Sequence, residues 1–376
     1  FVNDEYIKFL KEHKDDEVYK QAYSYQITLA KKEMPEQPTG GILSAGISNQ
    51  MVARAFAYMM GEVDKAHARE TIDYVIEYCQ NAKTKETYSI NIYKDYGNQA
   101  IQCGALVYDW CYDAMTPAQR NELATAVRDH MYSSEQPCRP DNTGGADWGD
   151  INGKAVGQPI IYNTIGATAI YDLYPEVYEA IMGKVQGTMA QISKLYGEAG
   201  ALTDGSTAYS REHYTYYVEL LLMRMGHDIS DIYGVQLPVG YKMLYGRLPY
   251  GSHIKTGDSG THLRYKIGTF ENSIEISGGM GFLQVMFEEP YLKHYYMREN
   301  STAGGVLNMI LKTSTHEAET PDDLPLAFEA FDPRSEIIHK TSWQEGMDSP
   351  QVTAYLNMNN RRSGDHDHAN FGSFQL

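Results

Sequence analysis

The chain has 376 residues, 42% of them hydrophobic, and a formal net charge of −17 at pH 7. This length and apolar content exclude a disordered chain and predict a globular protein with more than one domain. The charge argues against nucleic acid or an anionic membrane surface as the main partner, because both would repel it. No apolar run reaches the roughly 18 residues that a membrane span needs, so we expect no membrane span.

The sequence up to about residue 310 predicts amphipathic helices joined by short loops. Apolar residues recur at helical spacing over 50–60 and over 72–79. Thr116 followed by Pro117 is typical of an N-cap and a first helical residue, which predicts a helix that begins there. Further runs of this kind cover 155–174, 175–197 and 214–226. Because single amphipathic helices cannot bury their apolar faces, these helices should stack into a bundle, a solenoid or a closed α/α toroid.

Two residue types add expectations of their own. The four cysteines show no C-x-x-C spacing, and Cys103 and Cys111 lie in apolar, helix-like runs, so we expect buried free thiols. The chain has 31 tyrosines but only 3 tryptophans. Tyrosine suits a cleft that stacks sugars and hydrogen-bonds their hydroxyls, although a tyrosine-rich core would give the same count.

The pattern changes after about residue 321, where short runs are separated by turn residues. In the run QVTAYLNM, alternate residues would share the buried face of a strand: Val352, Ala354, Leu356 and Met358. We therefore predict a helical domain over 1–320 and the first strands of an antiparallel β domain over 321–376. A fragment of two or three strands would leave open edges, so we expect the sequence to stop inside a larger domain.

Two histidines alternate with acids in the closing segment DHDHAN. His366 and His368 are two residues apart, so on a strand they would point to the same face. They supply only two ligands, whereas a zinc site needs three or four. The residues alone leave three interpretations open: part of a metal site, a contribution to a catalytic cleft, and a polar turn.

Helices followed by a strand that opens with HDHANFGSF resemble the heparinase II/III-like polysaccharide lyases. The segment GALTDGSTAYSREHYTYY is similar to that family's Gly/Ser-rich loop, which carries a catalytic tyrosine with an arginine close behind. GALVYDWCYDAMTPAQR and SEIIHKTSW also resemble family segments. The resemblance implies an α/α toroid followed by a β-sandwich. It also implies a bacterial enzyme, periplasmic or secreted, that acts on an anionic polysaccharide or oligosaccharide.

The implied reaction is β-elimination in a uronic acid, in which the weakly acidic proton at C5 is removed and the oxygen at C4 leaves. The substrate carboxylate must be neutralised, and a base and an acid must reach the two reacting positions. Tyrosine suits either part when nearby positive charge lowers its pKa. By the resemblance, Tyr209 is the catalytic tyrosine, and Arg211 would favour the tyrosinate or hold the carboxylate.

The resemblance also implies a carboxylate-neutralising asparagine in the glycine-rich stretch NTGGADWGDINGKAVGQP, and Asn152 matches it. Relatives commonly follow this asparagine with a histidine, whereas this sequence has Gly153 and Lys154. The departure leaves the base open, so it would be Tyr209 itself or a histidine of the terminal motif. His366 is expected in the cleft as an acid, a base or a carboxylate contact.

Other side chains near these motifs are expected to contact the substrate. Trp148 would stack on a sugar face. The remaining candidates for substrate binding are Lys154, His213, Tyr214, Arg264 and Arg362. The reaction requires no cofactor, but some relatives hold a structural zinc in the sandwich through the second histidine of the motif. His368 is therefore a candidate metal ligand.

Two other functions stay open from the sequence. A glycoside hydrolase on an α/α toroid would use one or two carboxylic acids, and Asp147, Asp150 and Asp204 lie in the loops. A non-catalytic glycan-binding protein would use the same cleft without chemistry.

Overall fold

In the computed structural model of the chain, the residues described are 2–38, 45–81, 90–133, 157–196, 212–228, 236–249, 254, 274–297, 306, 309, 311, 315–330, 336–346, 348–358 and 373–375. Packing divides the chain into two compact units. The first comprises Phe1–Thr188 with Thr302–Thr313, and the second comprises Met189–Ser301 with Ser314–Leu376.

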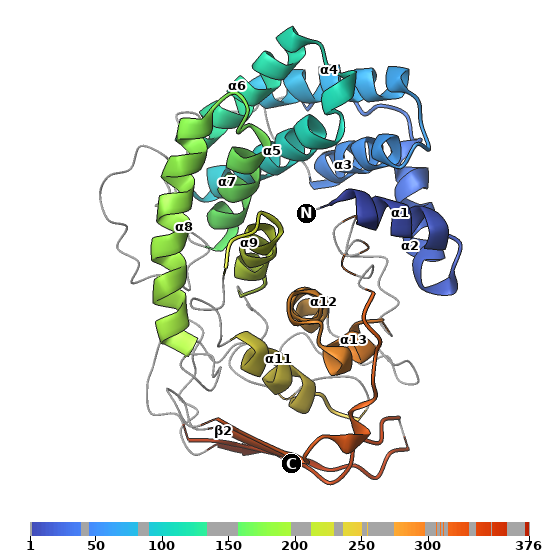
Figure 1. The fold of residues 1–376 in the computed structure, drawn as a ribbon, viewed down its shortest axis with the longest axis vertical. Coiled ribbons are helices and arrows are strands. Elements are labelled where there is room, and N and C mark those ends of the chain that lie inside the picture. The colour runs from blue at the N-terminus through green and yellow to red at the C-terminus, as the bar shows by residue number, and fades with distance from the viewer. Residues whose placement is uncertain are drawn as a thin grey trace. The chain divides into compact units, whose positions relative to one another are not determined.

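The first unit is built from helices (Figure 1). They are α1 (Asp4–His13), α2 (Glu17–Ala30), α3 (Ala45–Met59), α4 (Lys65–Asn81), α5 (Ile90–Trp110), the short η2 (Tyr112–Ala114), α6 (Pro117–Ser133), α7 (Gly157–Ala169) and α8 (Pro175–Tyr196), whose last turns belong to the second unit. Helix α5 is central to this packing, because it contacts α3, α4, α6 and α7. Cys103 lies within α5, and Cys111 is the residue after its end. Both are buried free thiols, as the sequence predicts.

The start of α6 confirms the predicted cap. The backbone N–H of Gln119 donates to Oγ1 of Thr116 at 3.2 Å, and the helix begins at Pro117. In return, the backbone N–H of Thr116 donates to Oε1 of Gln119 at 2.9 Å. The two contacts form a capping box, which satisfies backbone donors that the first turn leaves without partners.

Helices α5 and α6 approach each other closely at Gly104, where a Cβ would lie 2.6 Å from Cγ2 of Val127. We therefore expect Gly104→Ala to lower the free energy of unfolding by about 1–3 kcal/mol, because the added carbon overpacks the core. The matched control is Gly183→Ala in α8, where a Cβ would meet nothing within 4 Å. That control should raise stability by up to about 1 kcal/mol through helix propensity. Urea unfolding measures both, and equal effects would contradict the close approach.

The second unit combines helices with a small sheet (Figure 1). Its elements are α9 (Glu212–Arg224), α11 (Gln236–Tyr245), α12 (Ile274–Phe287), α13 (Pro290–Met297), the short η5 (Pro321–Asp323), β1 (Ala327–Ala330), β2 (Glu336–Lys340), β3 (Thr353–Asn357) and β4 (Ser373–Gln375). Helix α12 packs against α9, α11 and α13, and α11 also contacts β1 and β2. In neither unit is a described helix both long and apolar enough to span a bilayer.

The four strands form one antiparallel sheet in the order β1-β2-β3-β4. The predicted change from helices to antiparallel strands after residue 320 is thus confirmed in its coarse form. A closed toroid, a two-sheet sandwich and the domain boundary at residue 320 stay predictions.

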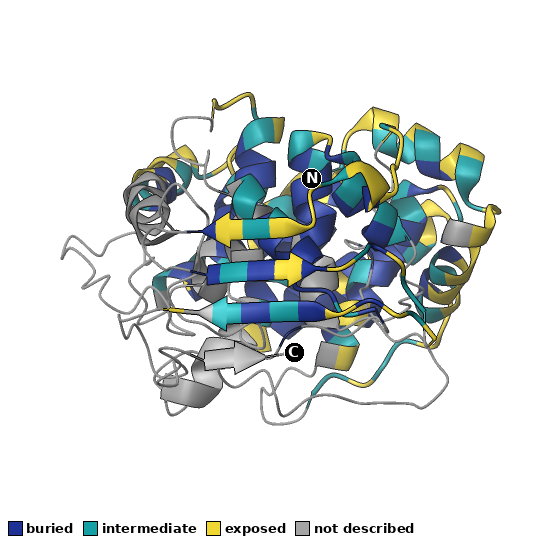
Figure 2. Cartoon of the chain, turned by 90° about the horizontal axis from the view of Figure 1, so that it is seen from below, coloured by how far each residue is buried: buried dark blue, intermediate teal, exposed yellow. Residues whose placement is uncertain are grey.

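The sequence predicted the wrong buried face for β3. Val352 and Met358, expected inside, are 48% and 36% exposed, whereas Thr353 and Tyr355 are 6% and 1% exposed. The reason is a polar interaction, since the Tyr355 hydroxyl donates to Oε1 of buried Glu336 at 3.0 Å. Buried and more exposed residues alternate along β2, one of the strands drawn in Figure 2. Alternation therefore identified the strand, but the apolar residues did not mark its inner side.

Candidate functional site

Most of the predicted site residues lie in connections outside the described residues. Trp148, Asn152 and Lys154 fall in 134–156, Tyr209 and Arg211 in 197–211, Arg264 in 255–273, and Arg362, His366 and His368 in 359–372. His213 and Tyr214 belong to the first turn of α9, where the backbone alone is described. The roles given to these residues therefore stay predictions.

The elements that flank two of these connections belong to the second unit. Helix α9 begins at Glu212, the residue after Arg211. On the sheet, β3 ends at Asn357 and β4 begins at Ser373, and these two residues face each other in the antiparallel register. The connection that carries His366 and His368 therefore begins and ends next to one pair of facing residues, Asn357 and Ser373.

A buried ionic network joins helix α11 to the sheet of this unit. Lys242 of α11 forms an ion pair with Glu336 of β2, which also accepts the hydrogen bond from Tyr355. Residue exposure is 0% for Glu336 and 8% for Lys242. A carboxylate buried this completely needs its charge and its oxygens compensated, and the two partners do this from different elements.

The same unit contains a second pair of buried cations, Lys340 of β2 and Arg247. The Nζ of Lys340 donates to the backbone carbonyl of Arg247 and lies 5.0 Å from the ring centre of Trp343. Arg247 in turn pairs with Glu345, with 2.7 Å between Nε and Oε1. The pKa of Lys340 is lowered to about 8, mainly by burial; the charge of Glu345 opposes the shift, and that of Arg247 adds to it. Lys340 is 2% exposed, so substrate has no access to it and we assign it to fastening the sheet.

Because its pKa is lowered, Lys340 makes a contribution to the free energy of unfolding that rises with pH. Below pH 8 the folded and unfolded states both hold the proton, and the folded state carries the full cost of the buried charge. Between about 8 and 10.5 the folded state has lost the proton while the unfolded state keeps it, so the free energy of unfolding increases. The full window corresponds to about 3 kcal/mol.

Urea unfolding of the wild type and of Lys340→Met between about pH 7.5 and 10, below ordinary tyrosine ionisation, should show this increase as the difference between the two proteins. Lys340→Met removes the titrating lysine but keeps the buried thiols Cys79, Cys103 and Cys111, whose pKa values are raised by burial. Their contribution to the free energy of unfolding falls over the same range in both proteins, so it cancels in the difference. The same slope in both proteins would contradict the assignment of the pH dependence to Lys340.

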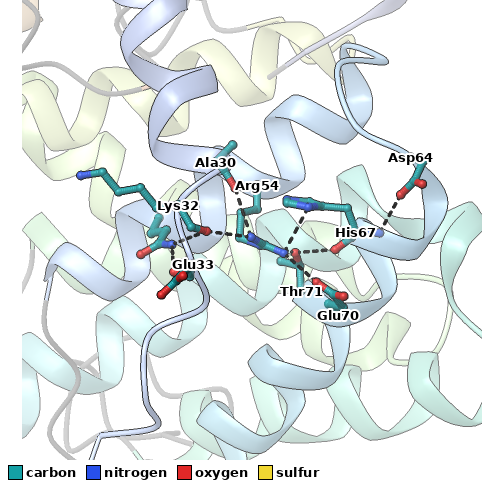
Figure 3. Close-up of polar contacts among 9 residues, drawn as sticks. Ala30, Lys32, Glu33, Arg54, Asp64, His67, Glu70 and Thr71 are labelled. Atoms are coloured by element: carbon teal, nitrogen blue, oxygen red, sulfur yellow. Dashed lines mark hydrogen bonds and ion pairs between the residues drawn. The ribbon is translucent and has the colours of Figure 1, made fainter.

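The first unit contains a separate polar cluster around Arg54, which is 3% exposed (Figure 3). Its guanidinium lies between the end of α2 and one face of α4. Nη1 donates to the carbonyl of Ala30 at 3.1 Å, Nε donates to Oγ1 of Thr71 at 2.9 Å, and Nη2 contacts Oε2 of Glu70 at 3.2 Å. Nη2 also lies 3.3 Å from Nδ1 of His67.

This cluster fastens three helices. The last carbonyls of a helix have no partners inside it, and Arg54 supplies a charged donor to the end of α2. Burial and the Arg54 charge lower the pKa of His67 below 6.5, so the neutral imidazole accepts from the guanidinium at neutral pH. The bonds from Arg54 to Ala30 and Thr71 hold α2 and α4, which makes the cluster structural.

A third polar group surrounds the turn between α12 and α13. Burial raises the pKa of Glu289, while a hydrogen bond from the Tyr241 hydroxyl at 3.0 Å opposes the shift. Lys293 donates to the carbonyl of His316. In the part of the chain that the structure describes, no three His, Cys, Asp or Glu side chains are arranged to hold a metal ion. His368 lies outside that part, so its proposed zinc is untested.

The chain matches no protein-family model, and no curated protein matches it.

Sequence reasoning missed the network that joins α11 to the sheet. Glu336, Ile338 and Lys340 alternate in SEIIHKTSW and are all at most 2% exposed. Charged residues at alternate positions ordinarily indicate the solvent face of a strand, so the pattern points to the wrong side. The partner Lys242 lies far away in the sequence, and no local signal connects it with Glu336.

Proposed function

We propose that the protein is a polysaccharide lyase that cleaves a uronic-acid-containing polysaccharide by β-elimination. The observation that carries the proposal is a pair of motifs within the second unit. Tyr209 and Arg211 directly precede α9, while His366 and His368 lie between two antiparallel strands. In the family that the sequence resembles, a helical domain and an antiparallel sheet contribute these two motifs to one cleft.

In the proposed reaction the C5–H bond breaks and its electron pair forms the double bond between C4 and C5. The bond from C4 to the glycosidic oxygen breaks, and that oxygen leaves with a proton. Tyr209 donates this proton, and the base at C5 is Tyr209 itself or His366. The products together have the atoms of the substrate, so no water is consumed.

The substrate carboxylate opposes the loss of the C5 proton, because it makes the resulting carbanion less stable. Asn152 and Arg211 are proposed to neutralise it, so that the negative charge can spread onto the carboxylate oxygens as an enediolate. Arginine suits this task because its planar guanidinium can bind both oxygens of a carboxylate.

An anionic substrate must also approach a protein with a net charge of −17. Repulsion between exposed charges is screened over about 8–10 Å at physiological salt, so local charge decides binding. Lys154, Arg264 and Arg362 are the proposed local cations, and Trp148, His213 and Tyr214 complete the proposed contacts. A structural zinc at His368 and a periplasmic or secreted location are parts of the same proposal.

A panel of uronic-acid polymers tests the proposal. Ultraviolet absorbance of the unsaturated product and the number of reducing ends would be followed together. We expect both to increase with at least one polymer. Reducing ends without absorbance would indicate a hydrolase, and binding without either signal would indicate a glycan-binding protein, so either result would overturn the lyase proposal.

A further inference from the structure

At the end of the sheet where the histidine-bearing connection begins, three residues of neighbouring strands lie in one row: Glu336, Asn357 and Ser373. In the antiparallel register Glu336 faces Asn357, and Asn357 faces Ser373. Asn357 and Ser373 close the connection 358–372, which carries His366 and His368. Glu336 is therefore the β2 neighbour of the pair that holds the base of this connection.

Glu336 is bound from two directions at this row. Tyr355, two residues before Asn357 on β3, donates its hydroxyl hydrogen bond at 3.0 Å. Lys242 approaches from α11 and forms the ion pair. Tyr355 is 1% exposed and Glu336 is completely buried, so solvent does not compete for these contacts. The Lys242–Glu336–Tyr355 triad thus joins the ends of two strands to one helix.

Helix α11 is itself fixed on its other side. A Cβ at Gly240 would lie 2.7 Å from Cδ1 of Leu292 and 3.0 Å from Cδ1 of Leu283, so α11 approaches α13 and α12 closely there. Gly240 and Lys242 are two residues apart, which places them about 200° apart around a helix. One face of α11 therefore packs on helices while the opposite face holds the sheet, as its place in Figure 1 shows.

A continuous path of packing follows from these contacts. The sheet end is held to α11, α11 packs on α12, and α12 packs on α9. Helix α9 begins directly after Arg211, two residues beyond Tyr209. Both ends of the path thus adjoin the two segments that carry the proposed catalytic residues.

A charged triad has a property that an apolar contact lacks. Apolar side chains of similar size often stabilise a buried site as well as an ion pair does, but they tolerate small shifts of one element against another. An ion pair and a hydrogen bond to the same carboxylate are satisfied in one arrangement only. The triad therefore specifies where the sheet end lies relative to α11.

We propose that Lys242, Glu336 and Tyr355 are positioning residues for the reaction, which hold the base of the histidine-bearing connection in register with α11 and, through α12, with α9. The catalytic consequence rests on the proposed lyase function, whereas the fastening of the connection does not. A displacement of about 1 Å at a reacting group lowers a rate by about 100-fold, so loss of the triad should lower kcat more than it changes KM.

The test compares two tyrosines of the second unit whose hydroxyls each donate a hydrogen bond, buried for Tyr355 and partly buried for Tyr245. Tyr355→Phe removes the bond to Glu336, and the matched control Tyr245→Phe removes the 2.6 Å bond to the carbonyl of Pro325. The two variants should have similar stability. We expect kcat to fall about 10- to 100-fold in Tyr355→Phe alone, with KM unchanged. Equal kcat values in both variants would overturn the catalytic role.

A second readout needs no activity. Spin labels on cysteines placed at His227, which follows the C-terminal end of α9, and at Met358, at the start of the connection, report the distance between α9 and the base of the connection. Both positions are exposed. Cys138 is replaced by serine, and Cys79, Cys103 and Cys111 are buried and stay in place. The distance distribution should broaden in Tyr355→Phe and stay narrow in Tyr245→Phe.

Lys242→Met alone would leave Glu336 buried without its counter-charge, so the double variant Lys242→Met with Glu336→Gln is used in its place. It should fold and show the broad distribution. Narrow distributions in all variants would overturn the positioning proposal even if the enzyme is a lyase. Broadening in a protein with no lyase activity would instead overturn the proposed function and leave the fastening role in place.

Discussion

Replacement of Tyr209 by phenylalanine should lower turnover on the true polymer by about 10²–10⁴-fold while KM stays close to the wild-type value. The change keeps the aromatic ring, so stacking on a sugar would survive. It removes the hydroxyl that we propose hands a proton to the leaving oxygen. Initial rates followed by ultraviolet absorbance over a range of polymer concentrations separate kcat from KM.

Two comparisons make the Tyr209→Phe result specific. Tyr25 is 51% exposed in the first unit, and Tyr25→Phe should leave kcat and KM unchanged. Asn152→Ala should raise KM as well as lower kcat, because a carboxylate contact also stabilises the bound substrate. Near-normal turnover in Tyr209→Phe would show that the proton passes through another group, with His366 and His213 as the next candidates.

The largest effect on stability should come from Arg54→Met. Methionine fills a similar length but cannot donate, so the buried carbonyl of Ala30 and the hydroxyl of Thr71 lose a charged partner. Buried acceptors that lose their donors cost about 1–3 kcal/mol each, so the free energy of unfolding should fall by about 2–5 kcal/mol. The contact to Glu70 adds little, because that side chain is 69% exposed.

The control for Arg54→Met is Arg69→Met, which removes an exposed arginine from α4. It should change the free energy of unfolding by less than about 0.5 kcal/mol. Arg54→Lys keeps the charge but not the planar fork of donors, so its stability should fall between those of the wild type and Arg54→Met. Urea unfolding measures all three, and a small effect of Arg54→Met would contradict the role of Arg54 in holding α2.

Local signals in the sequence predicted the helices well. The cap at Thr116 and Pro117 is encoded within four residues, and the structure forms it as expected. The apolar stripe within 72–79 is buried in α4 for the same reason, since helical spacing is a property of neighbouring residues. Neither feature depends on contacts with distant parts of the chain.

Features that depend on distant partners were not predicted. The alternation in β3 does not tell which of its two faces is buried. In the structure, the face that carries Tyr355 is buried, and Tyr355 bonds to Glu336 there. Burial of Glu336 in turn requires Lys242 from another element. For the candidate site, the sequence supplied residues and roles through a resemblance, and Tyr209 and His366 lie outside the described residues.

The most direct test of cleavage by β-elimination is mass spectrometry of the products formed in water labelled with oxygen-18. Elimination consumes no water, so the proposal predicts that the fragment with the new non-reducing end is one water lighter than its hydrolysis counterpart. The other fragment should gain label no faster than a free reducing end exchanges its anomeric oxygen with water. Fragments of full hydrolysis mass, with label incorporated at each cleavage faster than this exchange, would show that water attacks the glycosidic bond. That result would contradict the lyase function and favour a hydrolase.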